Sequence, residues 1–213
     1  LENHPWFELV AVAASPRSAG KTYEEAVGGR WKMKTPMPEA AKKLVVLNVN
    51  QVEEVAAQVD FVFSAVDMSK DEIRAIEEAY AKAEVPVVSN NSAHRWTPDV
   101  PMMVPELNPE HAEIIPYQRK RLGTKRGFIA VKPNCSIQSY TPALHALREF
   151  EPTLVVATTY QAISGAGKTF KDWPEMIDNV IPYIAGEEEK SEQEPLRIWG
   201  KIEDGVIKKA EGP

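Results

Sequence analysis

The sequence of 213 residues predicts an α/β fold built on a doubly wound parallel sheet. Short apolar runs alternate along the chain with segments whose apolar residues recur at helical spacing, and this alternation is typical of strand–helix–strand units. The composition, with 43% apolar and 26% charged residues, is that of an ordinary globular protein. Longer apolar segments begin after Cys135, so we expect a first domain over residues 1–134 and a second over residues 135–213.

The expected strands are apolar runs bounded by polar or turn-forming residues. They are Glu8–Ala14, Lys43–Val49, Asp60–Val66, Pro86–Ser89, Phe128–Val131 and the longer Thr153–Ile163. A hairpin is expected over Ile198–Lys208, because the Asp204-Gly205 pair is a preferred two-residue turn.

The expected helices lie between these runs. They are Asn50–Gln58, Asp67–Glu84, Pro109–Leu122, Ser136–Phe150 and Trp173–Ala185. The clearest is Asp67–Glu84, because Ser69 and Glu72 have the spacing of a capping box at its start. The segment Asn90–Pro105 is expected to be irregular, and Glu187–Glu194 is an acidic run that most often forms a solvated surface.

Charge and cysteine content exclude several classes of protein. With 25 basic and 31 acidic residues the net charge is -6, which argues against nonspecific nucleic-acid binding and favours a soluble, cytoplasmic protein. The apolar runs are too short to cross a bilayer. One cysteine allows no intrachain disulfide, and with four scattered histidines it gives no zinc-binding pattern, so no metal is expected.

Cys135 stands where the Phe128–Val131 run passes through a Pro-Asn turn into a helix. At a helix N-terminus the unpaired backbone N–H groups and the helix dipole favour a thiolate and can hold a developing oxyanion. The alternative is a buried structural cysteine, since free cysteine is among the most buried residue types. His145 follows ten residues later on the same helix, roughly 15 Å away, which is too far for a base acting on this thiol.

Three polar loops follow expected strands, and each could bind a ligand or be an ordinary turn. Ser15–Lys21 contains no carboxylate, and the next acidic residue is Glu24. A basic loop after a strand suits the 2′-phosphate of NADP. Ser89–Trp96 offers one guanidinium among small polar residues, which could hold a phosphate or carboxylate. Tyr160–Gly167 ends in small residues that let the backbone approach a ligand closely.

The order of these motifs resembles aspartate-semialdehyde dehydrogenase, of the branch common in archaea and fungi. The matching stretches cover nearly the whole chain: HPWFELVAVAASPRSAGK at 4–21, DFVFSAV at 60–66, SNNSAHRW at 89–96, VPELN at 104–108, PNCS at 133–136, TTYQAISGAG at 158–167 and EEEKSEQE at 187–194. The resemblance implies a Rossmann-like NADP-binding domain followed by an α+β catalytic and dimerisation domain.

The resemblance also implies an activity and residues that carry it. The family reduces L-4-aspartyl phosphate to L-aspartate 4-semialdehyde with NADPH, releasing phosphate, on the route to lysine, threonine, methionine and isoleucine. Its homo-oligomers are dimers or tetramers, so the expected partners are a small substrate and further copies of the chain. By resemblance, the catalytic residues are Cys135, Asn134 and Gln161; the substrate ligands are Arg95, Glu187 and Lys190; and the cofactor ligands are Ser15, Arg17, Ser18, Ser164 and Gly165.

Two features of the family pattern are not found in these residues. The family begins with a strand and a Gly-rich turn that precede the stretch matched at Leu1, and its acid–base histidine follows the stretch that ends at Pro213. We therefore expect this sequence to be an excerpt that is inactive and poorly stable alone. A malonyl-CoA reductase of the same branch and a noncatalytic homologue remain as alternatives.

Overall fold

The computed structural model describes residues 1–211 and divides them into two compact units. The first unit contains Leu1–Trp96 and Ile115–Val131, and the second contains Thr97–Ile114 and the chain from Lys132 onward. The expected domain boundary at residue 134 stays a prediction. The last two residues of the expected second domain, 212 and 213, lie outside the described part of the chain. By contact, however, residues 97–114 belong with the later part of the chain.

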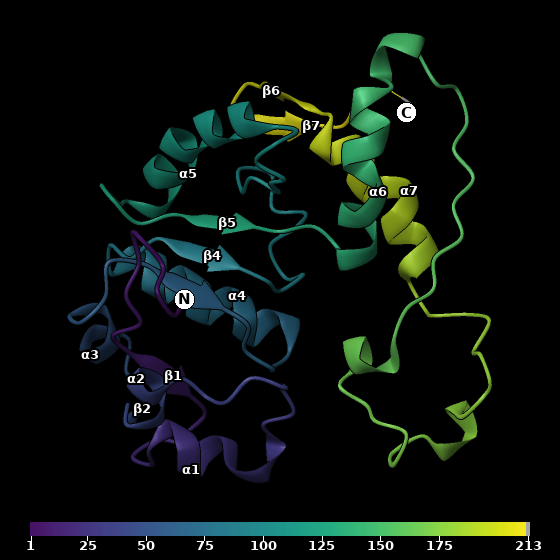
Figure 1. Cartoon of the computed structure of the whole chain (residues 1–213). Helices are drawn as coiled ribbons and strands as arrows, with labels where there is room; N and C mark the ends of the chain where they lie inside the picture. Colours follow the sequence, from purple (N-terminus) through teal and green to yellow (C-terminus); the bar gives the residue numbers. More distant parts are fainter. Residues whose placement is uncertain (212–213) are drawn as a thin grey trace. The chain divides into compact units, whose positions relative to one another are not determined.

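The first unit is a mixed α/β structure with parallel sheets, as the sequence predicts (Figure 1). Strands β1 (Val12–Ala14) and β2 (Val46–Asn48) form one parallel pair. Strands β3 (Val62–Ser64), β4 (Val87–Ser89) and β5 (Ile129–Val131) form a second parallel sheet in that order. Each strand lies inside a run expected from its apolar residues, although each is shorter than that run.

Helix α4 (Lys70–Lys82) covers the three-stranded sheet by packing against β4 and β5. Its capping box forms as expected: the Ser69 hydroxyl accepts from the Glu72 backbone N–H, and the Glu72 carboxylate accepts from the Ser69 N–H at 3.0 Å. The inner face buries Ile73, Glu77, Tyr80 and Ala81. The Tyr80 hydroxyl donates to the Val49 carbonyl at 2.8 Å, and burial raises the pKa of this phenol to about 12.

The other helices of the first unit are short. Helices α3 (Val52–Ala56) and α5 (Ile115–Leu122) lie within predicted segments. The 3₁₀ helix η2 (Pro109–Ile114), which precedes α5 in the chain, belongs to the second unit. Helices α1 (Tyr23–Val27), η1 (Gly28–Arg30) and α2 (Glu39–Lys42) have no counterpart in the sequence prediction. A capping box of Thr22 and Glu25 starts α1, a signal of the same type as the one used for α4.

The second unit is built on two adjacent helices, α6 (Cys135–Ala146) and α7 (Glu187–Ile198). Val104, Leu107, Ile137 and Ile198 form its buried apolar cluster, with Tyr140 and Trp199 packed against them. The hairpin of β6 (Lys201–Glu203) and β7 (Val206–Lys208) turns at Asp204-Gly205, as predicted.

Buried polar side chains join residues 97–114 to this unit. The Arg197 guanidinium donates to the carbonyl oxygens of Thr97 at 2.7 Å and Val100 at 2.9 Å. The His111 ring bridges the Asn108 side chain and the Gly200 carbonyl at 3.0 Å each. These donors satisfy backbone carbonyls that would otherwise be unpaired, and they tie residues 97–114 to the second unit.

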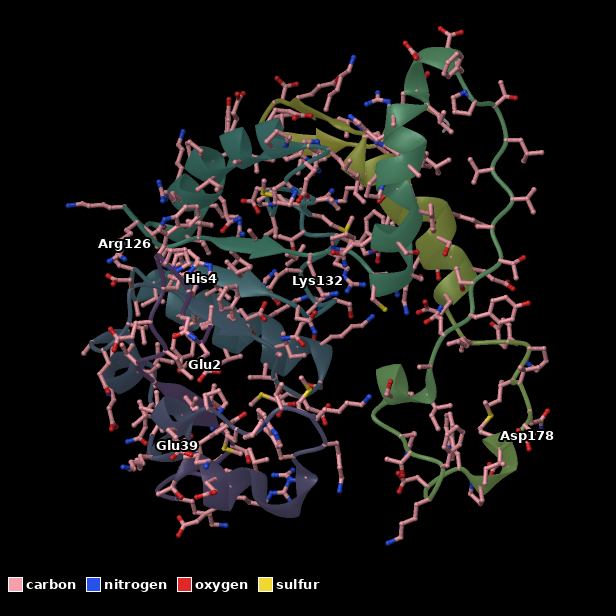
Figure 2. The ribbon with its side chains drawn as sticks, viewed as in Figure 1. Glu2, His4, Glu39, Arg126, Lys132 and Asp178 are labelled. Atoms are coloured by element: carbon pink, nitrogen blue, oxygen red, sulfur yellow. The ribbon has the colours of Figure 1, made fainter. Side chains whose placement is uncertain are left out.

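The segment between α6 and α7 contradicts two predictions. Thr153–Ile163, expected to be a strand, has no strand assignment, and Trp173–Ala185, expected to be a helix, contains only the 3₁₀ turn η5 (Pro174–Met176). Two further 3₁₀ turns, η3 (Arg148–Phe150) and η4 (Ile163–Ala166), flank and interrupt the extended part. Its apolar side chains are exposed, among them Val156 at 87% and Tyr160 at 92%, and Figure 2 labels Asp178 on this irregular stretch.

Candidate active site

Cys135 is the first residue of α6, and its side chain is exposed. The prediction of a helix starting at the Pro-Asn turn is confirmed, and the alternative of a buried structural cysteine is wrong. Asn134 is the N-cap of the helix: its side-chain oxygen accepts from the Ser136 backbone N–H at 2.8 Å and from the Ser136 hydroxyl at 2.6 Å. The thiol therefore lies at a helix start where it is open to a reactant.

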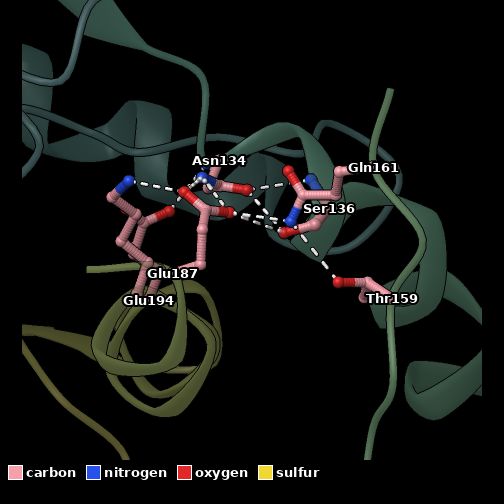
Figure 3. Close-up of polar contacts among 7 residues, drawn as sticks. Asn134, Ser136, Thr159, Gln161, Glu187 and Glu194 are labelled. Carbon is pink, nitrogen blue, oxygen red and sulfur yellow. Dashed lines mark hydrogen bonds and ion pairs between the residues drawn. The ribbon is translucent and has the colours of Figure 1, made fainter. Parts of the chain in front are cut away.

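Helix α7 brings its acidic residues to this helix start (Figure 3). The Asn134 side-chain amide donates to both Glu187 carboxylate oxygens, at 3.0 and 3.1 Å. The Asn134 backbone N–H donates to the Glu194 carboxylate at 2.7 Å. The Glu187–Glu194 run, read from the sequence as an acidic surface, is thus a helix whose first and eighth residues both hold the residue before the thiol.

Glu187 contacts three other predicted site residues of this unit, Asn134, Gln161 and Lys190. The Lys190 ammonium lies 2.6 Å from its carboxylate, and the Gln161 amide donates to it at 3.1 Å. Figure 3 shows Gln161 also reaching the Thr159 hydroxyl, at 3.4 Å. The structure therefore brings Cys135, Asn134, Gln161, Glu187 and Lys190 into one cluster, although they come from three separate segments.

The contacts of Glu187 favour the ionised form of its carboxylate. Partial burial raises its pKa, but hydrogen bonds from Lys190 and Gln161, the Lys190 charge and the Asn134 amide together hold the pKa below its usual value. The carboxylate is consequently ionised around neutral pH and balances the Lys190 ammonium. Such a pair can take up a substrate that carries an amine and an anionic group.

Glu194 is a site residue that sequence reasoning missed. It is only 1% exposed, whereas the neighbouring Glu188, Glu189 and Glu192 are exposed. The signal was available in the spacing, because positions 187, 190–191, 194 and 198 lie on one face of a helix. The high acidic content of the run masks this spacing, because such runs most often form a solvated surface.

The predicted substrate ligand Arg95 lies in the first unit, on the loop after β4. It is 7% exposed, and helix α4 anchors its loop at two points. The buried Glu77 carboxylate accepts from the Ser89 hydroxyl at 2.6 Å and the Asn91 amide at 3.0 Å, and the Arg74 guanidinium donates to the Ala93 carbonyl at 3.0 Å. Glu77 is a second acidic residue that sequence reasoning did not select.

The predicted cofactor loop follows β1 in the first unit. The Ser18 N–H donates to the Ser15 carbonyl at 2.9 Å in a tight turn, with Arg17 exposed and the two serines half-buried. Two hydroxyls and a guanidinium, with no carboxylate before Glu24, match the donor chemistry that a phosphate needs. The residues present therefore fit the 2′-phosphate of NADP.

Ser164 and Gly165, the other predicted cofactor ligands, lie in η4 of the second unit and are exposed. A Cβ placed on Gly165 would meet no atom within 4 Å, so no close approach of protein backbone requires glycine there. Ser164 lies with Gln161, Lys168 and Phe170 around an open pocket of about 450 Å³.

The four histidines have other surroundings. The His4 ring accepts from the backbone N–H groups of Trp6 and Phe7, and His94 is buried, which lowers its pKa. The His111 ring bridges Asn108 and Gly200, and the His145 ring accepts from the Trp199 indole N–H at 3.2 Å.

Within residues 1–211, no group of three or more metal-binding side chains is assembled. No helix in that part of the chain is long and apolar enough to cross a membrane.

A parallel α/β unit, followed by a unit that exposes a thiol at a helix start among amide, carboxylate and ammonium groups, defines the class of α/β proteins with a polar, thiol-bearing site. The sequence comparison narrows the class. Residues 1–115 match the model described as semialdehyde dehydrogenase, NAD binding domain. The chain belongs to the semialdehyde dehydrogenase family.

Curated relatives agree with this assignment. The chain is 42% identical over 204 residues to the aspartate-semialdehyde dehydrogenase of Aspergillus fumigatus, covering 95% of this chain and 54% of the relative. It is 39% identical over 211 residues to that of Methanothermobacter thermautotrophicus, covering 99% and 58%. The chain thus spans a little over half the length of these relatives.

A solved structure supports the fold in the same way. The crystal structure of aspartate-semialdehyde dehydrogenase with NADP from Candida albicans matches with a TM-score of 0.80 at 34% identity. The match covers 98% of this chain and 58% of that one. The Rossmann-like arrangement expected from the resemblance is therefore confirmed.

Proposed function

We propose that the protein carrying this chain is an NADP-dependent aspartate-semialdehyde dehydrogenase. It would reduce L-4-aspartyl phosphate to L-aspartate 4-semialdehyde through a thioacyl intermediate on Cys135. The observation that carries the proposal is the exposed Cys135 at the start of α6, joined through Asn134 to the Glu187, Lys190 and Gln161 cluster. The names of the relatives and the match to the NAD-binding domain support it.

The first chemical step uses the thiol. The Cys135 thiolate attacks the acyl carbon of the aspartyl phosphate, a C–S bond forms, and the C–O bond to phosphate breaks with the electron pair leaving on phosphate. Backbone N–H groups at the start of α6 can hold the negative charge that develops on the acyl oxygen. Gln161 and Asn134 orient the acyl group beside the thiol.

The remaining residues recognise the two ends of the substrate. The Glu187 carboxylate takes the substrate ammonium, and the Lys190 ammonium takes the phosphate. In the free protein these two side chains neutralise each other at 2.6 Å, so substrate binding exchanges one ion pair for two. Arg95, in the first unit, is proposed as a further ligand of the phosphate.

The first unit is proposed to hold the cofactor. Ser15, Arg17 and Ser18 would bind the 2′-phosphate of NADP, and Ser164 and Gly165 of the second unit would lie beside the nicotinamide. When bound, NADPH supplies the hydride that converts the thioester to the aldehyde level. The chain's own part is then to release the aldehyde and recover the Cys135 thiol.

The proposal is tested with the whole natural protein that carries this sequence, because the chain spans just over half of its relatives. NADPH formation is followed from L-aspartate 4-semialdehyde, with and without phosphate. We expect phosphate-dependent activity that is lost in Cys135→Ala. Since the side chain of Ser139 is also near the start of α6 and Ser139→Ala leaves the thiol intact, that variant is the matched control.

Each outcome has a distinct meaning. Activity that needs phosphate and Cys135 supports the proposal. A folded protein with a reactive thiol but no phosphate-dependent activity points to malonyl-CoA as the substrate instead. An inert Cys135 that fails to react with iodoacetamide points to a noncatalytic homologue.

The wider setting is part of the same proposal. The product aldehyde places the enzyme in the biosynthesis of lysine, threonine, methionine and isoleucine. A cytoplasmic location and assembly as a homodimer or homotetramer stay predictions from the resemblance. Sedimentation of the whole protein would decide between the two oligomers.

A further inference from the structure

Helix α7 holds the residue before the thiol at two points. Glu187 and Glu194 are seven residues apart, and therefore lie on the same face of the helix two turns from each other. Glu187 binds the Asn134 side chain, and Glu194 binds the Asn134 backbone (Figure 3). The first contact belongs to the substrate site already described, but the second does not.

We propose that Glu194 is a positioning residue that fixes the Pro133–Cys135 turn, and with it the thiol, by accepting the Asn134 backbone N–H. The proposal rests on the proposed function only in that Cys135 is taken as the nucleophile. Glu194 is 1% exposed, so its carboxylate is not available as a ligand for a substrate. It acts through Asn134.

The energetics of burial require this contact. Asn134 is 6% exposed and Glu194 is 1% exposed, so an Asn134 N–H without an acceptor would be a buried donor left unpaired, which is unfavourable. A carboxylate is also expensive to bury without donors. At 2.7 Å the hydrogen bond is at the short end of the range for N–H donors, as expected when the acceptor is charged.

The contact also determines where Cys135 can lie. Asn134 caps α6 with its side chain, and its backbone leads directly into the thiol-bearing residue. With the Asn134 N–H fixed by Glu194 and its amide fixed by Glu187, the turn has little freedom to rotate. A shift of about 1 Å in a reacting group can reduce catalysis by about 100-fold, so a loose turn would affect kcat before it affects binding.

Two substitutions distinguish the loss of the hydrogen-bond acceptor from the loss of the negative charge. Glu194→Gln keeps an acceptor oxygen at the same reach. Glu194→Asp shortens the side chain by about 1.5 Å, which breaks a hydrogen bond of this length. Glu192→Asp is the matched control, because it makes the same change on the exposed face of the same helix.

The test is made in the whole natural protein by steady-state kinetics. In Glu194→Asp we expect kcat to fall roughly 10- to 100-fold, while KM for phosphate and for NADP changes less than about threefold. Glu194→Gln should retain kcat within about threefold, and Glu192→Asp should match the parent. A merely structural role would lower the melting temperature of Glu194→Asp and leave kcat unchanged below it, and this result would overturn the proposal.

A second readout does not depend on activity. Hydrogen exchange in the peptide that contains Asn134 and Cys135 should speed up in Glu194→Asp and stay slow in Glu194→Gln. If the parent protein lacks the proposed dehydrogenase activity, the proposed function fails and exchange alone decides the role of Glu194. If the parent is active and Glu194→Asp exchanges and turns over like the parent, only the positioning role fails.

Discussion

Glu84 shows how one carboxylate can hold a turn in this protein. It follows α4 in a left-handed conformation, with φ of 65°, and its carboxylate accepts the backbone N–H groups of Arg126 at 2.6 Å, Gly127 at 3.0 Å and Lys125 at 2.9 Å. The N–H groups of Arg126, Gly127 and Lys125 hold the pKa of Glu84 at about 2. Ionised Glu84 therefore joins the end of α4 to the turn before β5.

This pKa predicts an acid-dependent contribution to stability. Because the folded pKa of about 2 lies below the usual 4.5, the contribution is complete above pH 4.5 and is lost as the pH falls toward 2. Glu84→Gln should be less stable than the parent at pH 7, and the difference should shrink over that window. Urea unfolding at several pH values measures it. Glu54→Gln removes a carboxylate from the exposed face of α3 and is the control for the loss of one negative charge.

Buried glutamates whose partners are distant in the chain mark the limit of what the sequence predicts in the site. Cys135 is predictable because a strand, a Pro-Asn turn and a helix are readable from neighbouring residues. The role of Asn134 comes from the family resemblance. Glu194 and Glu77 were missed because their partners are 60 and 12 residues away in the chain. Nothing local distinguishes them from exposed glutamates until the packing of the helices is known.

The turn before β5 approaches helix α4 so closely that only glycine fits at position 127. A Cβ there would lie 1.8 Å from the Ala81 carbonyl oxygen and 2.7 Å from its carbon. These are backbone atoms of α4, so the clash cannot be relieved by a side-chain rotation. The approach also allows Glu84 to reach the Gly127 N–H.

Gly127→Ala should therefore destabilise the first unit by about 2 kcal/mol or more, because the helix must move away from the sheet. For a chain of this size that corresponds to a melting temperature about 4–8 °C lower. Calorimetry or far-UV circular dichroism measures the change. Gly29→Ala is the control, since its Cβ would meet no atom within 4 Å; an equal loss in both variants would contradict the argument.

Elements were predictable where local signals and tertiary partners agree. Helix α4 has a capping box and an apolar face, and β3, β4 and β5 pair with one another. Thr153–Ile163 has the residues of a strand, but in the described part of the chain it has no neighbouring strand, and an isolated strand leaves its backbone groups unpaired. Its propensity alone could not supply that partner.

The two units of the molecule differ in how evenly they are packed. The first unit carries a continuous set of helices and strands, whereas the second contains a long stretch, 151–186, with only 3₁₀ turns and many exposed apolar side chains. Backbone that makes few buried contacts opens with little free energy. Such segments are the usual sites of first proteolytic cleavage.

Limited proteolysis of the chain of 213 residues should therefore begin within 151–186. Chymotrypsin has exposed targets there in Tyr160, Phe170 and Tyr183, at 92%, 56% and 60% exposure. Tyr117 in α5, at 53% exposure, is the matched internal control, because it is as accessible but lies in a helix packed against α4. Mass spectrometry of the first fragments identifies the cut. Early cleavage at Tyr117 would show that the exposure of a side chain, and not the local packing of its backbone, decides where the protease cuts. Resistance at Tyr160, Phe170 and Tyr183 would show that another chain or another copy covers the segment.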